Sequence, residues 1–240
     1  KCGHELKNTT ITDPFIINDP LSVTAIKKLS ILDKFKLRIS LTSRRSNAFL
    51  VDVGSSSGKF LYHIQDKFKK TIGVEITPSS VEFSKTQLNL AIVPHIQDVG
   101  FEKISLVTFW HSLEHIPFSE INDILKMISI YAEKDVRILV SVPNADALIY
   151  QMFGKKFAYC DRASHVHQFS VQSLDLLFAK YNFSKEKTFF SFSYSFFGYL
   201  QTLVNLGNVT DNFLYFFLKR NREFGKNRTK IFLLFIYNVL

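Results

Sequence analysis

The chain has 240 residues, of which 46% are hydrophobic and 21% charged, and its formal net charge is +9. This composition excludes a disordered or fibrous chain and leaves room for one sizeable core, while the charge suits nucleic acid, an anionic membrane surface or an acidic substrate. Two cysteines exclude a disulfide framework and favour a reducing, cytoplasmic compartment.

Residues 1–47 are interpreted as an N-terminal extension. Asp13-Pro14 and Asp19-Pro20 are turn signals. Apolar and basic residues alternate with a partial helical period over 22–39, so we expect one or two helices that cover a sheet edge or the mouth of a ligand site. The Lys and Arg residues there are expected to face solvent. Because the chain starts without methionine and stops on an apolar run, we expect a fragment or trimmed form of a longer protein.

The chain is organised around a strand, a turn of small residues and a helix. Residues 48–53 are apolar enough for a short buried strand, and residues 54–58 contain only Gly and Ser. A turn of this kind lets the backbone approach a nucleotide-like ligand, and the start of the next helix offers free N–H groups. The expected helix, 59–68, has one apolar face made of Phe60, Leu61, Ile64 and Phe68.

Strand and helix patterns then alternate along the chain. The strand 71–76 carries Glu75 about 20 residues after the turn, where a carboxylate binds ribose hydroxyls in a doubly wound fold. Residues 145–170 are long for a connection, so we expect a lid or substrate loop. The alternation predicts an α/β fold with a doubly wound, mostly parallel sheet. We also expect helices at 78–90, 119–130 and 173–180, and strands at 92–96, 104–110, 135–142 and 187–192.

Residues 48–183 contain four short motifs, which are Asp52-Val-Gly54-Ser-Ser56-Ser-Gly58, Gly73-Val-Glu75, Trp110-His111-Ser-Leu-Glu114-His115 and Ser141-Val-Pro143-Asn144. In their order and spacing they resemble class I S-adenosylmethionine-dependent methyltransferases. The sub-type with Leu-Glu-His after the fourth strand is the most similar, and its late His-x-x-x-Phe-Ser segment is matched from His165 to Ser170. That family has Gly where this chain has Ser56, which we interpret as a tolerated small residue.

The resemblance implies a Rossmann-like fold, S-adenosyl-L-methionine as cofactor and S-adenosyl-L-homocysteine as product. Asp52 would orient the turn and approach the methionine amino group, and Glu75 would accept hydrogen bonds from both ribose hydroxyls. Asp98 and Val99 would contact the adenine. The implied cofactor-binding residues are Asp52, Gly54, Ser55, Ser56, Gly58, Glu75, Ile76, Asp98, Val99 and His111.

Methyl transfer needs a protein base only if the acceptor must lose a proton. His111, His115 and His165 are the candidate catalytic residues, because histidine titrates near neutral pH. Alternatively, His111 borders the cofactor, and Glu114 and His115 cap the loop. The His-x-x-Glu-His spacing also matches an inverted zinc-peptidase motif, but the preceding strand and Pro117 leave no room for the long helix that this motif needs. We therefore predict no metal site; a metal ion bound by Glu114 and His115, which the similarity to some lipid-quinone methyltransferases suggests, is the weaker alternative.

The pattern changes in residues 193–240, which are rich in Phe, Tyr and Leu and contain a basic stretch at 219–230. Neither apolar run reaches the ~20 residues of a membrane span. We expect an aromatic-rich C-terminal appendage that makes peripheral membrane contact through 189–240, with an aromatic core or an oligomer interface as the alternative. The expected domains are therefore 1–47, 48–192 and 193–240.

These features predict a methyltransferase that acts on an oxygen of a small-molecule or lipid-linked acceptor. One alternative is a cofactor-binding domain that has lost catalysis and serves as a binding subunit. RNA methylation ranks last, because only the net charge favours it and no added RNA-binding module is seen. A nicotinamide-dependent dehydrogenase is disfavoured, because Gly54-Ser55-Ser56 lacks the second glycine that pyrophosphate requires. The pattern does not indicate an oligomeric state.

Overall fold

The computed structural model describes residues 23–27, 38, 39, 42, 45–100, 102–154 and 165–190. They fall into two compact units, Lys1–Ser141 and Val142–Leu240, and each unit is described by itself. The predicted appendage at 193–240 and the middle of the predicted lid lie outside the described residues.

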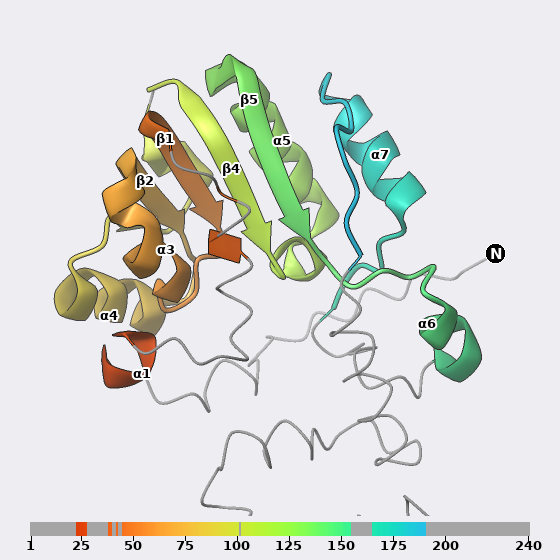
Figure 1. The fold of residues 1–240 in the computed structure, drawn as a ribbon, viewed down its shortest axis with the longest axis horizontal. Coiled ribbons are helices and arrows are strands. Elements are labelled where there is room, and N and C mark those ends of the chain that lie inside the picture. The colour runs from red at the N-terminus through yellow and green to blue at the C-terminus, as the bar shows by residue number, and fades with distance from the viewer. Residues whose placement is uncertain are drawn as a thin grey trace, which may run out of the picture. The chain divides into compact units, whose positions relative to one another are not determined.

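The first unit is built on a five-stranded sheet in the order β3-β2-β1-β4-β5, with every neighbouring pair parallel (Figure 1). This confirms the predicted doubly wound sheet. The chain moves outward in one direction from β1 and in the other from β4, so the strand order reverses between them, and ligands bind at such a reversal outside the carboxyl ends of the strands. The strands are β1 (Arg45–Val53), β2 (Phe68–Val74), β3 (Ile92–Val93), β4 (Ile104–Trp110) and β5 (Ala132–Ser141).

Helices cover both faces of this sheet. Right-handed crossovers on either side of the reversal put α3 and α4 on one face and α5 on the other (Figure 1). The helices are α1 (Val23–Lys27), α3 (Lys59–Ile64), α4 (Pro78–Leu88) and α5 (Phe118–Tyr131). Three short 3₁₀ turns complete the unit: η1 (Gln65–Lys67), η2 (Ile96–Val99) and η3 (Leu113–His115).

The apolar positions of these elements form the core. Every residue of β4 is buried, as expected for a central parallel strand. The predicted face of α5 is buried through Ile121, Ile124, Leu125 and Ile128, which confirms its helical period. Ile26 of α1 packs into the same core as Phe60 and Leu61 of α3, so the N-terminal extension contributes to the fold.

Several predicted boundaries are wrong. The helix after the turn ends at Ile64, and Phe68 begins β2, where it pairs with Arg45 of β1. Phe68 is buried in the strand, so its burial fits either assignment. The third strand stops at Val93, because Pro94 follows and cannot donate to a ladder. Residues 187–190, the described part of the predicted sixth strand, form no strand.

The second unit contains two described helices, α6 (Leu148–Phe153) and α7 (Val171–Ala179). The α6 helix lies within the predicted loop, and α7 begins two residues before the predicted helix. Ser170 caps α7, with Ser170 and Ser173 each accepting the other's backbone N–H. Asn144 and Phe169 form a parallel bridge, so the two ends of the long connection lie side by side. No helix among the described residues has the length and apolar character needed to cross a bilayer.

Candidate active site

The turn after β1 is fixed to the end of β2 by backbone hydrogen bonds. The N–H groups of Gly54 and Ser55 both donate to the Val74 carbonyl, at 2.8 and 3.1 Å. Ser56 has a φ of +50°, in the left-handed region. An L-residue there costs roughly 1–2 kcal/mol, whereas Gly adopts this conformation freely. This explains why Gly is the usual residue at this position in the family that the sequence resembles. In this chain the turn adopts the conformation with Ser56 in place of Gly.

The same turn packs tightly against the segment after β4. A Cβ atom added to Gly54 would lie 2.2 Å from the Cβ of Ser112, which leaves no space for a side chain. The Ser112 hydroxyl donates to the Val53 carbonyl at 2.6 Å. The carboxyl ends of β1, β2 and β4 are therefore held together by direct contacts.

Glu75 is the acid that follows β2, and it lies where the sequence predicts it. Its side chain is buried, and its Oε2 and Oε1 atoms accept the N–H groups of Ser56 and Thr77, both at 2.8 Å. Each carboxylate oxygen has a second lone pair, so Glu75 can accept further hydrogen bonds from a ligand. Ile76, the next residue, is 71% exposed and borders an open groove lined by Pro78, Val81 and Pro94.

Asp98 and Val99 form the end of η2, which packs against β2 and β3. Asp98 is exposed and Val99 is buried. The structure therefore places this predicted adenine contact beside the strand that carries Glu75 at its end.

Asp52 lies near the carboxyl end of β1 and is 2% exposed. The Thr108 hydroxyl donates to its Oδ1 at 2.6 Å. Burial raises the pKa of Asp52 to about 7, although the Thr108 hydrogen bond and the Arg38 guanidinium both act to lower it. The Asp52 carboxyl therefore changes its charge near neutral pH.

Replacing Asp52 by asparagine is expected to stabilise the ligand-free protein at neutral and alkaline pH. The folded-state pKa of Asp52 is above the unfolded value, so its contribution to stability is present below about pH 4 and is lost as the pH rises through about 7. Asparagine cannot ionise and avoids this loss, which is on the order of 2–4 kcal/mol. Denaturant unfolding at several pH values should show a gain that grows from about pH 4 to about pH 7.

The matched control for this prediction is Asp123→Asn, because Asp123 is exposed on α5. The control should leave the pH dependence of the wild type in place. If Asp52→Asn changes the free energy of unfolding by the same amount at acid and alkaline pH, the pKa of the buried Asp52 carboxyl is not raised.

Two residues that the sequence reasoning missed lie beside Asp52. Arg38 was expected to face solvent but is buried, with its guanidinium 5.3 Å from the centre of the Trp110 ring. That cation–π contact and the nearby carboxylate compensate for its burial. Nothing in the spacing of 22–39 distinguishes Arg38. Thr108 has a clearer signal, because it is opposite Asp52 in the register of β1 and β4.

His111 follows β4 in an unusual backbone conformation, with a φ of +55°. Its N–H group donates to the Ser141 carbonyl at 2.8 Å, because Trp110 and Ser141 are partners in the register of β4 and β5. The Nε2 atom of His111 lies 3.2 Å from the Ser141 hydroxyl, and its Nδ1 atom lies 3.4 Å from Oε1 of Glu114. The structure thus brings together His111, Glu114 and the end of β5.

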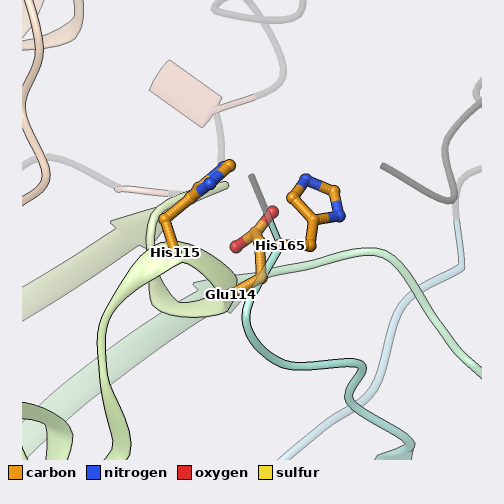
Figure 2. Close-up of side chains that lie close together, drawn as sticks. All are labelled: Glu114, His115 and His165. Carbon is orange, nitrogen blue, oxygen red and sulfur yellow. The ribbon is translucent and has the colours of Figure 1, made fainter. Parts of the chain in front are cut away.

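Glu114 and His115 extend from η3, the turn that follows β4 (Figure 2). The Glu114 side chain is 1% exposed, whereas His115 is exposed. Burial alone would raise the pKa of Glu114, but the His111 imidazole, 3.4 Å away, and the charge of His115 hold this pKa below its ordinary value. The third predicted base, His165, belongs to the second unit, where it is partly buried.

A family model described as a methyltransferase domain matches residues 27–188. A comparison with curated proteins found no matching relative. One similar solved structure is an S-adenosylmethionine-dependent methyltransferase from Archaeoglobus fulgidus, with 19% identity, a TM-score of 0.53, and 65% of this chain and 70% of that chain covered.

Two further solved structures are similar to this chain. The cyclopropane synthase MmaA2 from Mycobacterium tuberculosis has 11% identity and a TM-score of 0.52, with 67% of this chain and 65% of that chain covered. The mitomycin 7-O-methyltransferase MmcR has 16% identity and a TM-score of 0.51, with 64% of this chain and 49% of that chain covered. At these identities the similarity shows the fold. The chain spans between 49% and 70% of the length of the three structures.

Proposed function

Because this chain belongs to the S-adenosylmethionine-dependent methyltransferase family, we propose that it transfers the cofactor's methyl group to an oxygen of a small-molecule or lipid-linked acceptor. The observation that carries the proposal is the Glu75 carboxylate. It lies at the end of β2 next to the reversal in strand order, it holds the turn after β1, and it retains lone pairs for the ribose hydroxyls.

The neighbouring residues fit this cofactor. The exposed apolar side chain of Ile76 and the groove beside it offer a face for a purine ring. The Ser55 hydroxyl is buried next to Gly73, away from solvent, so no contact with the cofactor is assigned to it. When ionised, Asp52 matches the cofactor's amino group. When bound, S-adenosylmethionine supplies an electrophilic methyl group on a positively charged sulfur.

A neutral hydroxyl acceptor must lose its proton, so an oxygen acceptor favours a base at the carboxyl edge of the sheet. We assign this role first to His111, because its imidazole lies at the end of β4 with Nδ1 next to a carboxylate. His115 and His165 are the alternative bases. The lipid-linked class of acceptor, and peripheral membrane contact, rest on the aromatic and basic sequence of 189–240, most of which lies outside the described residues.

Calorimetric titration of the full chain is expected to show one saturable site for S-adenosylmethionine and for S-adenosylhomocysteine. The protein is then incubated with methyl-labelled S-adenosylmethionine and a cell extract, which is afterwards separated into water-soluble and organic-soluble fractions. Label in the organic-soluble fraction would favour a lipid-linked acceptor, and label in the other fraction a small molecule. Failure of a folded protein to bind either ligand would refute the proposal, and binding without any transfer would favour the binding-subunit alternative.

A further inference from the structure

Three side chains at the carboxyl ends of β4 and β5 form a continuous polar chain. The Ser141 hydroxyl lies 3.2 Å from Nε2 of His111, and Nδ1 of His111 lies 3.4 Å from Oε1 of Glu114. Both nitrogens of the imidazole therefore face an oxygen within the first unit. Because both nitrogens of His111 already contact an oxygen, the most direct route for a substrate proton to His111 is through the Ser141 hydroxyl that contacts Nε2.

Glu114 is the most deeply buried of the three side chains. The Glu114 side chain is 1% exposed, and its oxygens have no partner at hydrogen-bond geometry among the described residues. The His111 side chain is 27% exposed, and Ser141 is partly buried. A buried carboxylate is costly unless an opposite charge lies beside it, so Glu114 favours a proton on His111. His115, on the same turn, is the other titratable group that acts on Glu114.

The backbone of His111 is held in a strained conformation that serves this arrangement. Its φ of +55° is rare for a residue with a side chain, and its N–H group binds the Ser141 carbonyl at 2.8 Å. Strain of this kind persists where the surrounding structure requires it, which is frequently at functional sites. Both the backbone and the side chain of His111 are thus fixed on Ser141.

We propose that Ser141, His111 and Glu114 form a proton relay, an inference that rests on the proposed transfer to oxygen. The Ser141 hydroxyl accepts the proton of the acceptor's O–H group and passes its own proton to Nε2 of His111. The acceptor oxygen uses the freed electron pair to bond the methyl group that leaves the cofactor's sulfur, and the imidazolium carries the proton. Ser141 and His111 are catalytic residues, and Glu114 is a positioning residue that keeps Nδ1 protonated and stabilises the imidazolium.

This arrangement has the same logic as a Ser-His-acid triad, in which the acid orients the imidazole and the imidazole takes the serine proton. The difference lies in the electrophile. A methyl group on a sulfonium is attacked by the acceptor, so the serine oxygen needs only to transmit a proton. If Glu114 only capped the loop, the rate of methyl transfer would not depend on the Ser141 hydroxyl.

The first test uses nitrogen-15 spectra of the histidine side chains in the full chain, with S-adenosylhomocysteine bound. In the wild type we expect the Nδ1-protonated tautomer of His111, and in Glu114→Gln a mixture of tautomers and a lower apparent pKa of His111. Glu120→Gln is the matched control, because Glu120 is exposed on α5. Identical His111 titrations in folded wild type and folded Glu114→Gln would overturn the relay, whether or not transfer is seen.

The second test measures label transferred from S-adenosylmethionine to the extract as a function of pH. Ser141→Ala and Glu114→Gln should each reduce the rate at neutral pH by about a hundredfold, the lower end of general-base effects, with cofactor affinity unchanged. With a phenolic acceptor, whose pKa is near 10, the deficit should shrink at alkaline pH, because such an acceptor ionises without a base. Ser141→Thr, which keeps the hydroxyl, should recover the rate, and Ser129→Ala, at an exposed serine of α5, should have no effect.

The two tests separate failure of the relay from failure of the proposed function. A wild-type protein that binds no cofactor, or transfers no label, refutes the proposed function, and the His111 spectra then decide whether Glu114 controls the imidazole. If Ser141→Ala transfers label as rapidly as the wild type at every pH, the relay is refuted, whereas the proposed methyl transfer is not affected.

Discussion

Replacing Glu75 by alanine is expected to weaken binding of S-adenosylhomocysteine by about a hundredfold to ten-thousandfold. A hydrogen bond to a charged acceptor contributes roughly 1.5–3 kcal/mol, and Glu75 is proposed to accept two from the ribose. The same substitution leaves the N–H groups of Ser56 and Thr77 without their acceptor, so the turn after β1 loses one of its attachments. Calorimetry on the full chain measures the dissociation constant directly.

Two variants make this experiment specific. Glu75→Gln keeps one carbonyl acceptor and should show an intermediate loss of affinity. Glu120→Gln changes an exposed acid on α5, away from the groove beside Ile76, and should bind as the wild type does. One hydrogen bond to a charged group contributes about tenfold or more to affinity. If Glu75→Ala binds within about threefold of the wild type, the cofactor does not contact this carboxylate.

Replacing Gly54 by alanine is expected to reduce the free energy of unfolding by about 2–5 kcal/mol, which is a large part of the stability of a typical domain. The added Cβ would lie 2.2 Å from the Cβ of Ser112, and Gly54 has a φ of +75°. The turn must therefore move away from the segment after β4 or adopt a strained conformation. Denaturant unfolding without cofactor measures the loss.

The chain offers an internal control for this prediction. Gly100 has a φ of +93°, and a Cβ added there would meet nothing within 4 Å. Gly100→Ala therefore carries backbone strain alone, of roughly 1–3 kcal/mol, because a φ of +93° with a ψ of −176° is essentially restricted to glycine. Adding Ser112→Gly to Gly54→Ala should restore part of the loss. An equal loss for Gly54→Ala with and without Ser112→Gly would show that the overlap is relieved at no cost.

Elements with a strong and uninterrupted period were predictable from the sequence. The boundaries of β4 were predicted correctly, and α5 differs from its prediction by one residue at each end, because apolar spacing alone defines both. The segment from 59 to 74 was predicted less well, since Phe68 continues the apolar spacing of the helix but forms the first residue of β2. A period cannot separate the two assignments when the residue is buried in both.

The candidate site divides in the same way. Gly54 and Glu75 are part of short local motifs, so their positions at the ends of β1 and β2 could be predicted, and their contacts with the cofactor stay predictions. The contact of His111 with Ser141 depends on the register of β4 and β5, which local sequence does not specify. The burial of Arg38 likewise depends on a distant Trp110. Contacts between distant segments therefore supplied the residues that the sequence reasoning missed.

The outer edge of the sheet has a consequence for association between copies of the chain. Within the described residues, β5 pairs with β4 along one edge and with no strand along the other. An open strand edge is a template for another chain, and charged side chains are a common protection against such pairing. The first part of β5 provides them, so a second strand that extended the sheet here would have to strip water from charged groups of both signs. These residues are Glu133, Lys134, Asp135 and Arg137.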